Sequence, residues 1–369
     1  MMRRTLVGSG LAGLALLATG LPAQAAVRHG WQVGEDLGSG NFAKSVDAMA
    51  ASGPRDIWAF GGQLVVSGGL HGIPWAQHYD GRKWTTVRLP SGPRGYFYAA
   101  AAVSSKNIWA FGAMNNTMAG YFTAHYDGKH WTYLKGGKAT FGNQVAVVGS
   151  RDVWVAQSTG QAYQYLLRWT GSSWHRYTVP GTMLGAVAGL SSNDVWAAGL
   201  DINAEPEVLH FDGTRWRVVT VPKAPSVDAP LMGILPLSNT SVFAVGSVYN
   251  AQGGAPLVLH DNGPSWSVVD TSAFSQTGSL GTPVSDGHGG FWAEQDAPSD
   301  MASQEPGYVP MVHFSNGHLT KATLPKLPGL LNQVFQIVTV PGSHDLWAPA
   351  NYQTSIGGNW GTLLLHYTP

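Results

Sequence analysis

The chain has 369 residues, of which 48 are glycine, 15 are tryptophan and none is cysteine. Lysine plus arginine and aspartate plus glutamate number 21 each, so no basic surplus favours a nucleic acid, and disulfides and cysteine chemistry are excluded. Charged residues make up only 11%, against roughly 25% in an average soluble domain, and this composition, rich in glycine and tryptophan, indicates a turn-rich β protein.

The first 25 residues have the pattern of a secretory signal peptide. Arg3 and Arg4 form a charged start, residues 6–21 are mostly apolar, and Ala23-Gln24-Ala25 supplies a cleavage site of small residues. A membrane anchor is the alternative, but the apolar stretch is short and glycine-rich, and a cleavage motif follows it. We therefore predict a signal peptide over 1–25, a secreted, extracellular mature chain over 26–369, and no contact with a membrane.

An Asp-Val-Trp-Ala type of signature recurs seven times along the rest of the chain. Its aromatic positions are spaced by 42 to 55 residues and are Trp58, Trp109, Trp154, Trp196, Phe243, Trp292 and Trp347. The average spacing of about 48 residues is typical of one four-stranded propeller blade.

A second signature follows each of the first six copies, beginning with His78-Tyr79-Asp80-Gly81 and ending at Trp84. Asp-Gly between two apolar runs predicts a tight hairpin, because the turn needs residues with positive φ. Each unit therefore reads as four strands a to d. The Asp-Val-Trp run forms strand b, and His-Tyr ends strand c.

The seventh copy lacks its last strand, because only Thr368 and Pro369 follow His366-Tyr367. An unpaired strand d at the other end of the chain, Trp31-Gln32-Val33, can complete this blade and hide both sheet edges. The sequence thus predicts an all-β fold over 26–369. It is a single seven-bladed β-propeller with four-stranded blades, and the N-terminal strand completes the last blade.

These tandem repeats resemble those of secreted bacterial β-propellers, in the kelch-like and galactose-oxidase-like group. The resemblance covers 26–369 and implies the fold, but it says little about activity, because propellers host many functions. The chain departs from kelch repeats because only one blade has the diglycine after strand b, at Gly61-Gly62. Its lack of cysteine excludes the copper-radical chemistry of galactose oxidase.

Residues that recur in every blade are expected to be structural. We predict that the repeat tryptophans form the core between blades, where each buries a large area. We also predict that the repeat histidines bond to the Asp that opens strand b and bind no metal, since one per blade around a ring cannot converge. These histidines are His78, His125, His210, His260, His313 and His366.

The loops that vary between blades are expected to gather on one face and to carry binding residues. Aromatic rings beside amides suit a carbohydrate, because rings stack on sugar faces and amides pair with hydroxyls. The leading hypothesis is a non-catalytic protein that binds a glycan or cell-wall polysaccharide. Its candidate ligand-binding residues are Trp75, Arg94, Tyr96, Tyr98, Tyr121, Asn143, Tyr249, Tyr308, Tyr352 and Trp360.

Two alternatives remain open. The first is a propeller that binds an extracellular protein through the same face. The second is a polysaccharide lyase or glycoside hydrolase, for which His71, Tyr98, Arg94 and Glu294 are weak catalytic candidates. No motif for a cofactor or metal is present, so we expect neither, and we expect a monomer that does not bind nucleic acid.

Overall fold

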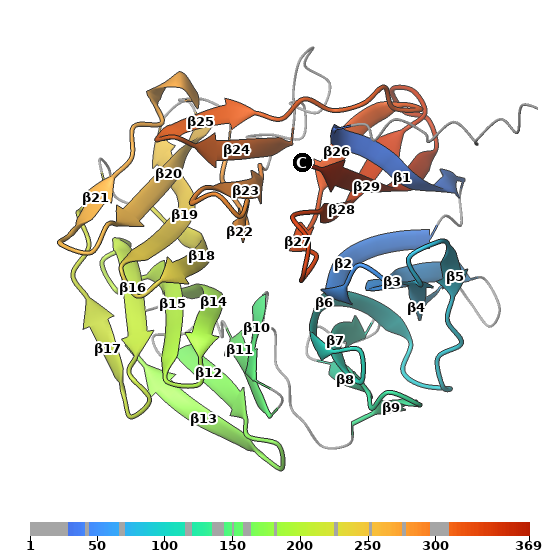
Figure 1. The fold of residues 1–369 in the computed structure, drawn as a ribbon, viewed down its shortest axis with the longest axis horizontal. Coiled ribbons are helices and arrows are strands. Elements are labelled where there is room, and N and C mark those ends of the chain that lie inside the picture. The colour runs from blue at the N-terminus through green and yellow to red at the C-terminus, as the bar shows by residue number, and fades with distance from the viewer. Residues whose placement is uncertain are drawn as a thin grey trace, which may run out of the picture.

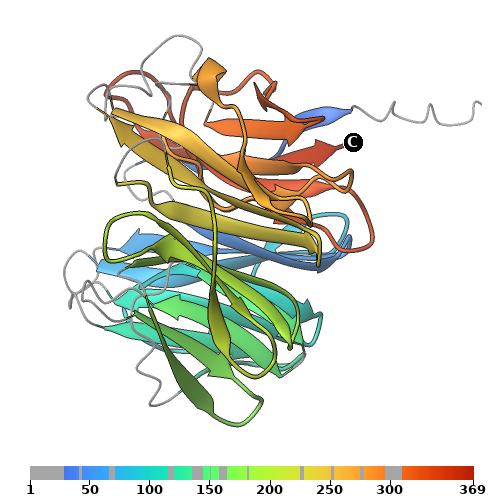
Figure 2. The same ribbon diagram turned by 90° about the vertical axis from the view of Figure 1, so that its left-hand side faces the viewer.

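Seven antiparallel sheets stand around a common axis, each running outward from an inner strand (Figure 1). Seen from the side, the strands run between the two faces of the resulting disc (Figure 2). The computed structural model describes residues 29–40, 44–65, 71–114, 120–134, 144–149, 151–157, 164–180, 183–224, 228–250, 253–274, 278–295 and 310–369. The predicted signal peptide, 1–25, lies outside these residues.

Six sheets have four strands each in chain order, and we number them blades 1 to 6. Blades 1 to 3 comprise β2 (Lys44–Gly53), β3 (Asp56–Val65), β4 (His71–Tyr79), β5 (Trp84–Thr86); β6 (Gly95–Ser104), β7 (Asn107–Met114), β8 (Tyr121–Tyr126), β9 (Trp131–Tyr133); and β10 (Gln144–Gly149), β11 (Asp152–Gln157), β12 (Gln164–Trp169), β13 (Trp174–Val179). Blades 4 to 6 comprise β14 (Met183–Ser191), β15 (Asp194–Leu200), β16 (Pro206–Phe211), β17 (Trp216–Val219); β18 (Leu231–Ser238), β19 (Ser241–Asn250), β20 (Gly253–Asp261), β21 (Trp266–Val268); and β22 (Val284–Ser285), β23 (Phe291–Glu294), β24 (Met311–Ser315), β25 (His318–Lys321). Among the described residues, one 3-10 turn, η1 (Ser272–Phe274), lies between the strands of blades 5 and 6 in the chain.

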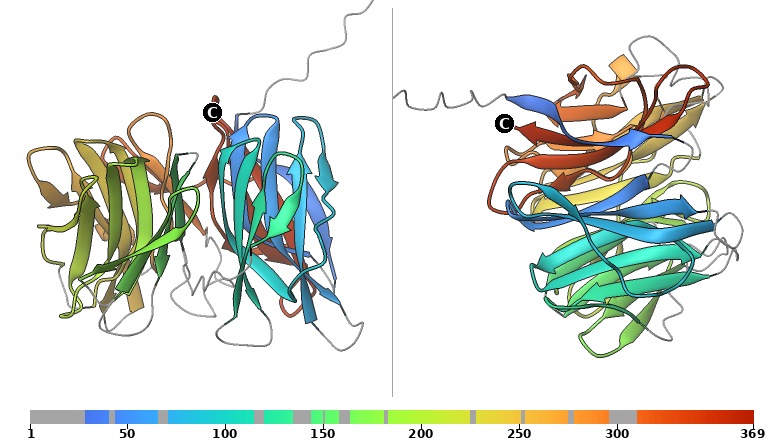
Figure 3. Two further views of the ribbon diagram at one scale, coloured as in Figure 1. Left: turned by 90° about the horizontal axis from the view of Figure 1, so that it is seen from below. Right: turned by 90° about the vertical axis from the view of Figure 1, so that its right-hand side faces the viewer.

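Blade 7 contains both ends of the described chain, as the sequence predicts. Its strands are β26 (Leu330–Val334), β27 (Val338–Thr339), β28 (Leu346–Gln353), β29 (Trp360–Thr368) and β1 (Gly30–Ser39). The outermost strand, β1, pairs antiparallel with β29 from Gly30 opposite Thr368 to Ser39 opposite Gly361. Figure 3 shows β1 beside this C-terminal strand. The seven-bladed propeller and its closure by the N-terminal strand are confirmed.

The inner strand of blade 7 departs from the four-strand pattern, because it is split into β26 and β27, which both pair with β28. Pro349 of β28 accepts a hydrogen bond from the Phe335 N–H at 2.9 Å, so its backbone polar atoms face the inner side. Proline has no N–H to donate on that side, which interrupts the ladder between the two short strands.

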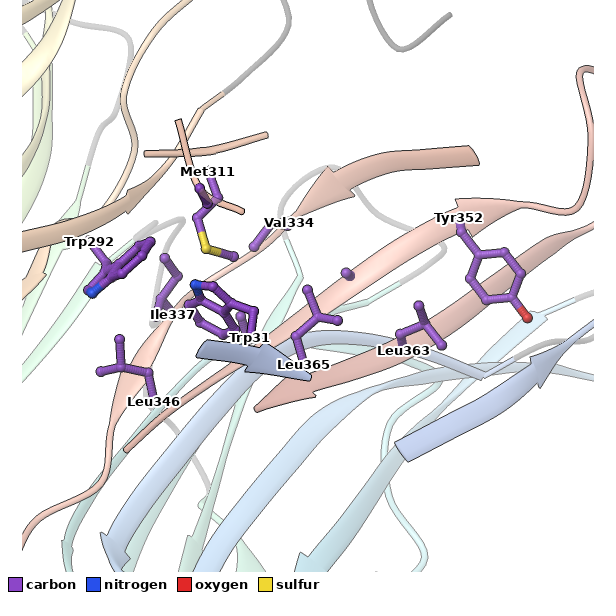
Figure 4. Close-up of a cluster of buried hydrophobic side chains, with 12 residues drawn as sticks. Trp31, Trp292, Met311, Val334, Ile337, Leu346, Tyr352, Leu363 and Leu365 are labelled. Atoms are coloured by element: carbon purple, nitrogen blue, oxygen red, sulfur yellow. The ribbon is translucent and has the colours of Figure 1, made fainter. Parts of the chain in front are cut away.

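The hydrophobic core is distributed among the interfaces between neighbouring blades. Seven clusters of buried apolar side chains in the described chain each join two adjacent blades around the ring. In the cluster that joins blades 6 and 7, Trp292 lies against Trp31, and Met311 and Leu365 belong to the same cluster (Figure 4). The repeat aromatic residues of strand b are all no more than 6% exposed. Their predicted core role is confirmed.

The repeat histidines bond to the Asp that opens strand b, as predicted, in blades 1, 4 and 7, while asparagine and serine take the place of this Asp in blades 2 and 5. The Nε2 atom of each histidine lies 2.8 to 3.2 Å from its partner in the pairs His78–Asp56, His125–Asn107, His210–Asp194, His260–Ser241 and His366–Asp345. The imidazole rings also pack on the strand-b aromatic rings, with centroids 4.0 to 4.4 Å apart in these blades. These histidines therefore fasten strand c to strand b.

In blades 3 and 6, other residues make the interaction that connects strand c to strand b. In blade 6, Gly290 stands where the acidic residue is expected, and His313 bonds instead to Asp286 from the preceding turn at 2.9 Å. In blade 3, Arg168 replaces the histidine and bonds to Asp152 through two nitrogens, at 2.9 and 2.6 Å. The position on strand c thus carries a histidine or arginine side chain in every blade. Its partner is either the residue that opens strand b or, in blade 6, a residue of the turn before that strand.

His125 and His260 have no acidic partner, and their protonation is expected to make stability depend on pH. Burial lowers the pKa of His125 and of His260 from the usual 6.5, with nearby acids opposing it. Below pH 6.5 these two histidines bind more protons in the unfolded chain than in the folded chain. Their contribution to stability is therefore complete above pH 6.5 and is lost as the pH falls through their folded-state pKa. We expect this contribution to the melting temperature to fall between pH 7.5 and 5. Asp47 and Glu207 act in the opposite direction, because burial raises their pKa values to about 6 and about 7, so the folded chain gains protons over the same range.

The double variant His125→Gln/His260→Gln should lack the loss that the histidines cause. Its melting temperature, measured by circular dichroism at each pH, should therefore rise relative to that of the unaltered protein as the pH falls over this range. His130→Gln, on an exposed turn of blade 2, is the control for a surface histidine. Equal slopes for the double variant and the unaltered protein would contradict the assignment.

Candidate ligand-binding site

A cavity of about 650 Å³ lies at the centre of the ring, and residues of all seven blades line it. Small residues on the inner strands keep it open, among them Ala99 and Ala100 of β6 and Ala188 and Gly189 of β14. Its volume falls in the range of roughly 300 to 1,000 Å³ that is common for ligand pockets. The cavity is therefore the natural starting point for a binding site.

The wall of this cavity has a polar and an apolar side. Blades 6, 7, 1 and 2, which are consecutive around the ring, contribute most of the polar side chains, namely Thr282, Glu294, Gln333, Gln336, Asp47, Tyr96 and Tyr98. Blades 3 to 5 contribute mainly apolar residues, namely Val145, Ala146, Val147, Val187, Ala188, Gly189, Ile234 and Leu235. A ligand with one polar edge and one apolar face would match this division.

Gln144 of β10 is the exception on the apolar side. Its side-chain amide donates to the backbone oxygen of Met232 at 3.3 Å and to the hydroxyl of Thr282. The Gln144 side chain thus connects blade 3 to blades 5 and 6 and narrows the cavity at the position where it crosses between these blades.

Two carboxylates lie in the wall. The Ser45 hydroxyl donates to Asp47 Oδ2 at 3.0 Å, and the Thr282 N–H donates to Glu294 Oε1 at 2.6 Å. Burial raises the pKa of Asp47 to about 6, although the hydrogen bond from Ser45 opposes this rise. At neutral pH Asp47 is therefore mostly ionised, in a place that disfavours its charge.

Three tyrosines gather at the blade 2 side of the cavity. Tyr96 is 42% exposed, and the ring of Tyr98 meets that of Tyr121 edge to face with centroids 6.4 Å apart. Burial, with a contribution from Tyr96, raises the pKa of Tyr121. These predicted residues, with Glu294, are the ones that the structure brings to the cavity or beside it.

The diglycine of blade 1 makes room for this arrangement. A Cβ on Gly61 would lie 2.1 Å from the backbone oxygen of Ser45, and one on Gly62 would lie 2.8 Å from the Cβ of Tyr96. Both positions therefore need glycine because another chain segment passes closely, and Tyr96 lies directly over this part of β3.

Two predicted binding residues are buried in the core. Trp75 on β4 is 5% exposed, with the Lys44 ammonium 4.8 Å from its ring centroid. Tyr352 on β28 is 3% exposed, and its hydroxyl donates to Asp36 at 3.4 Å. Contact of either ring with a ligand would require these interfaces to open, so we do not include them in the site.

The remaining predicted residues are dispersed. Tyr249 of blade 5 is 49% exposed and Trp360 of blade 7 is 46% exposed, and neither lines the cavity. Arg94 is exposed just before β6, and His71 of β4 is 9% exposed. Asn143 and Tyr308 lie outside the described residues. The roles of these residues stay predictions.

Sequence reasoning did not single out Asp47, Gln144 and Gln333 of the inner strands, or Gln336 between β26 and β27. A usable signal existed, because a polar side chain on strand a of any blade must face a neighbouring blade or the channel. Within the described residues, no group of three or more His, Asp or Glu side chains is arranged to hold a metal ion. That part of the chain also has no helix with the length and apolarity needed to cross a membrane.

Fold and cavity together define the class of this protein as a seven-bladed β-propeller with an axial pocket. No protein-family model matches the sequence, and no curated protein matches it. The predicted place within the kelch-like and galactose-oxidase-like group therefore stays a prediction.

Solved structures match the chain in fold. A chain from YCF48 bound to D1 peptide matches with a TM-score of 0.58 and 11% identity, over 93% of this chain and 98% of that one. A chain from the mitotic checkpoint complex matches with a TM-score of 0.59 and 10% identity, over 97% and 99%. SapL1 lectin in complex with alpha methyl fucoside reaches 0.46 with 15% identity, over 78% and 98%, which is too distant to carry an argument. The first two likenesses show the fold alone.

Proposed function

We propose that this protein is secreted and binds a glycan, without catalysis, at the mouth of the axial cavity. The observation that supports this most is the tyrosine group beside a cavity whose polar residues are amides, carboxylates and a hydroxyl. Tyrosine rings stack on the apolar face of a pyranose, while Gln333 and Gln336 offer both donors and acceptors to its hydroxyls. The division of the wall into polar and apolar sides suits the two faces of a sugar ring.

The first test is a screen of the mature chain, 26–369, on a glycan array and on purified cell walls. Tyr96→Ala should weaken binding of the best glycan about tenfold, since loss of a stacked ring costs about 1 kcal/mol or slightly more. Alanine keeps the Cβ that packs over Gly62, so the melting temperature of this variant should equal that of the unaltered protein. Isothermal titration calorimetry measures the affinity.

Trp360→Ala is the matched control, because Trp360 is as exposed as Tyr96 but does not line the cavity. Equal losses for the two variants would place the site across the whole face instead of at the cavity. Binding to no glycan or cell wall would contradict the proposed function.

Protein binding is the second candidate, and exposed apolar side chains around the same region support it. Leu64 and Ile73 on blade 1 and Met114 on blade 2 are 37% to 44% exposed, as is Tyr96 between these strands. YCF48, which shares the fold, was solved with a peptide bound. Reproducible recovery of one protein from culture supernatant, with no glycan bound, would favour this candidate.

A further inference from the structure

The charges in the cavity wall indicate which class of glycan the cavity can bind. Its charged residues are Asp47 of blade 1 and Glu294 of blade 6. Among the lining residues that the structure describes, none is lysine, arginine or histidine. We infer that the cavity recognises a positively charged sugar, a glycan with free amino groups, in preference to its N-acetylated or neutral counterparts. This inference rests on the proposed function and names the ligand class of the same site.

Asp47 gives the inference its physical basis. Its carboxylate lies in the channel wall, receives a hydrogen bond from the Ser45 hydroxyl, and has no cation beside it in the described wall. The neighbouring Lys44 instead lies over the ring of Trp75. A carboxylate that is partly removed from water and has no counter-charge is costly, and an ammonium group bound beside it would offset that cost.

The positions of the other polar groups favour a sugar over a simple cation. Gln333 and Gln336 come from blade 7, which lies between the blades that carry Glu294 and Asp47. Amide groups flanked by two carboxylates match a ring that carries both hydroxyls and an amine. On the other side of Asp47, Tyr96 and Tyr98 of blade 2 can stack on the ring, and aromatic faces also attract ammonium groups.

The test compares a tetramer of β-1,4-linked glucosamine with the same tetramer fully N-acetylated, by calorimetry at pH 7. We expect the free amine to bind at least about tenfold more tightly, since a hydrogen bond between charged groups contributes about 1.5 kcal/mol or more. Asp47→Asn, which keeps the side-chain shape and the Ser45 hydrogen bond, should remove most of this preference. Glu294→Gln should reduce it as well.

Stability separates a loss of charge from a loss of fold. Asp47→Asn should melt at or above the temperature of the unaltered protein, because a neutral amide costs less to bury than a carboxylate. Glu35→Gln in β1, the outermost strand of blade 7, removes an equal charge far from the cavity and should leave the preference unchanged.

Each result has a distinct meaning. Equal affinity for both tetramers, or a preference that survives Asp47→Asn, overturns the inference while the proposed function stands. A failure of every glycan on the array overturns both. Binding of oligolysine without binding of the glucosamine tetramer also overturns the inference, in favour of a basic peptide.

Discussion

A chain that lacks residues 26–40 is expected to lose most of its stability, with a large fall in melting temperature and a tendency to aggregate. This deletion removes β1, which pairs with β29 along nearly its whole length. It also removes Trp31, which is 3% exposed and lies 5.6 Å, centroid to centroid, from Trp292 of blade 6. The deletion would leave β29 as an open edge, and such edges pair with other chains.

Trp31→Ala isolates the contribution of the side chain. Truncation of a buried tryptophan costs about 3 to 5 kcal/mol, so urea unfolding should show a loss of that order. Trp360→Ala, at the start of the partner strand β29, is the control, because its ring is 46% exposed. If the two variants were equally stable, β1 would not close the ring as described.

Arg168→Leu is the second change with a large expected effect. The Arg168 guanidinium bonds to both oxygens of Asp152 and also donates to the Ser192 backbone oxygen at 3.2 Å. It stacks over the ring of Trp154 with 4.9 Å to the centroid. Because Asp152 is 6% exposed, loss of its partner leaves a buried charge uncompensated, which costs about 3 to 5 kcal/mol.

Arg217 provides a control at the same distance. Its Nη2 atom lies 2.6 Å from Asp212, as that of Arg168 does from Asp152, but the Arg217 side chain is 57% exposed against 16%. Arg217→Leu should therefore change the urea midpoint little, since solvent screens exposed ion pairs. Arg168→His, which restores the residue of the other blades, should recover part of the lost stability. Equal losses for the two leucine variants would show that burial is not decisive.

The fold could be predicted from the sequence because each blade uses nearly the same residues at the same positions to hold its strands together. The strand-b aromatic residue and the strand-c histidine recur at nearly constant spacing, and the missing strand of blade 7 matched Trp31-Gln32-Val33. Blade 6 shows the limit of this reasoning. There Asp286 bonds to His313 from outside the repeat position, which only the folded chain reveals.

The site was less predictable, for a reason visible in Trp75 and Tyr352. Both were assigned to variable loops, but β4 and β28 extend further than the repeat suggests, so these side chains alternate into the core. Conversely, Asp47 and Gln333 lie on inner strands, which carry no repeat motif. Residues that differ between blades therefore occur both in the loops and in the wall of the channel. These two groups can be distinguished only when the ends of the strands are known.

The pairing of β1 with β29 also determines the order in which the fold can be completed. Gly30 lies opposite Thr368, so the first described strand has its partner almost at the far end of the chain. A ribosome makes β1 first, and that strand must remain without its partner until the last residues are made. Joining such distant segments carries a high entropic cost before any contact offsets it. Ring closure is thus a late folding event. Until then Trp31 and Leu37 of this strand lack their packing partners and are open to contact with other proteins.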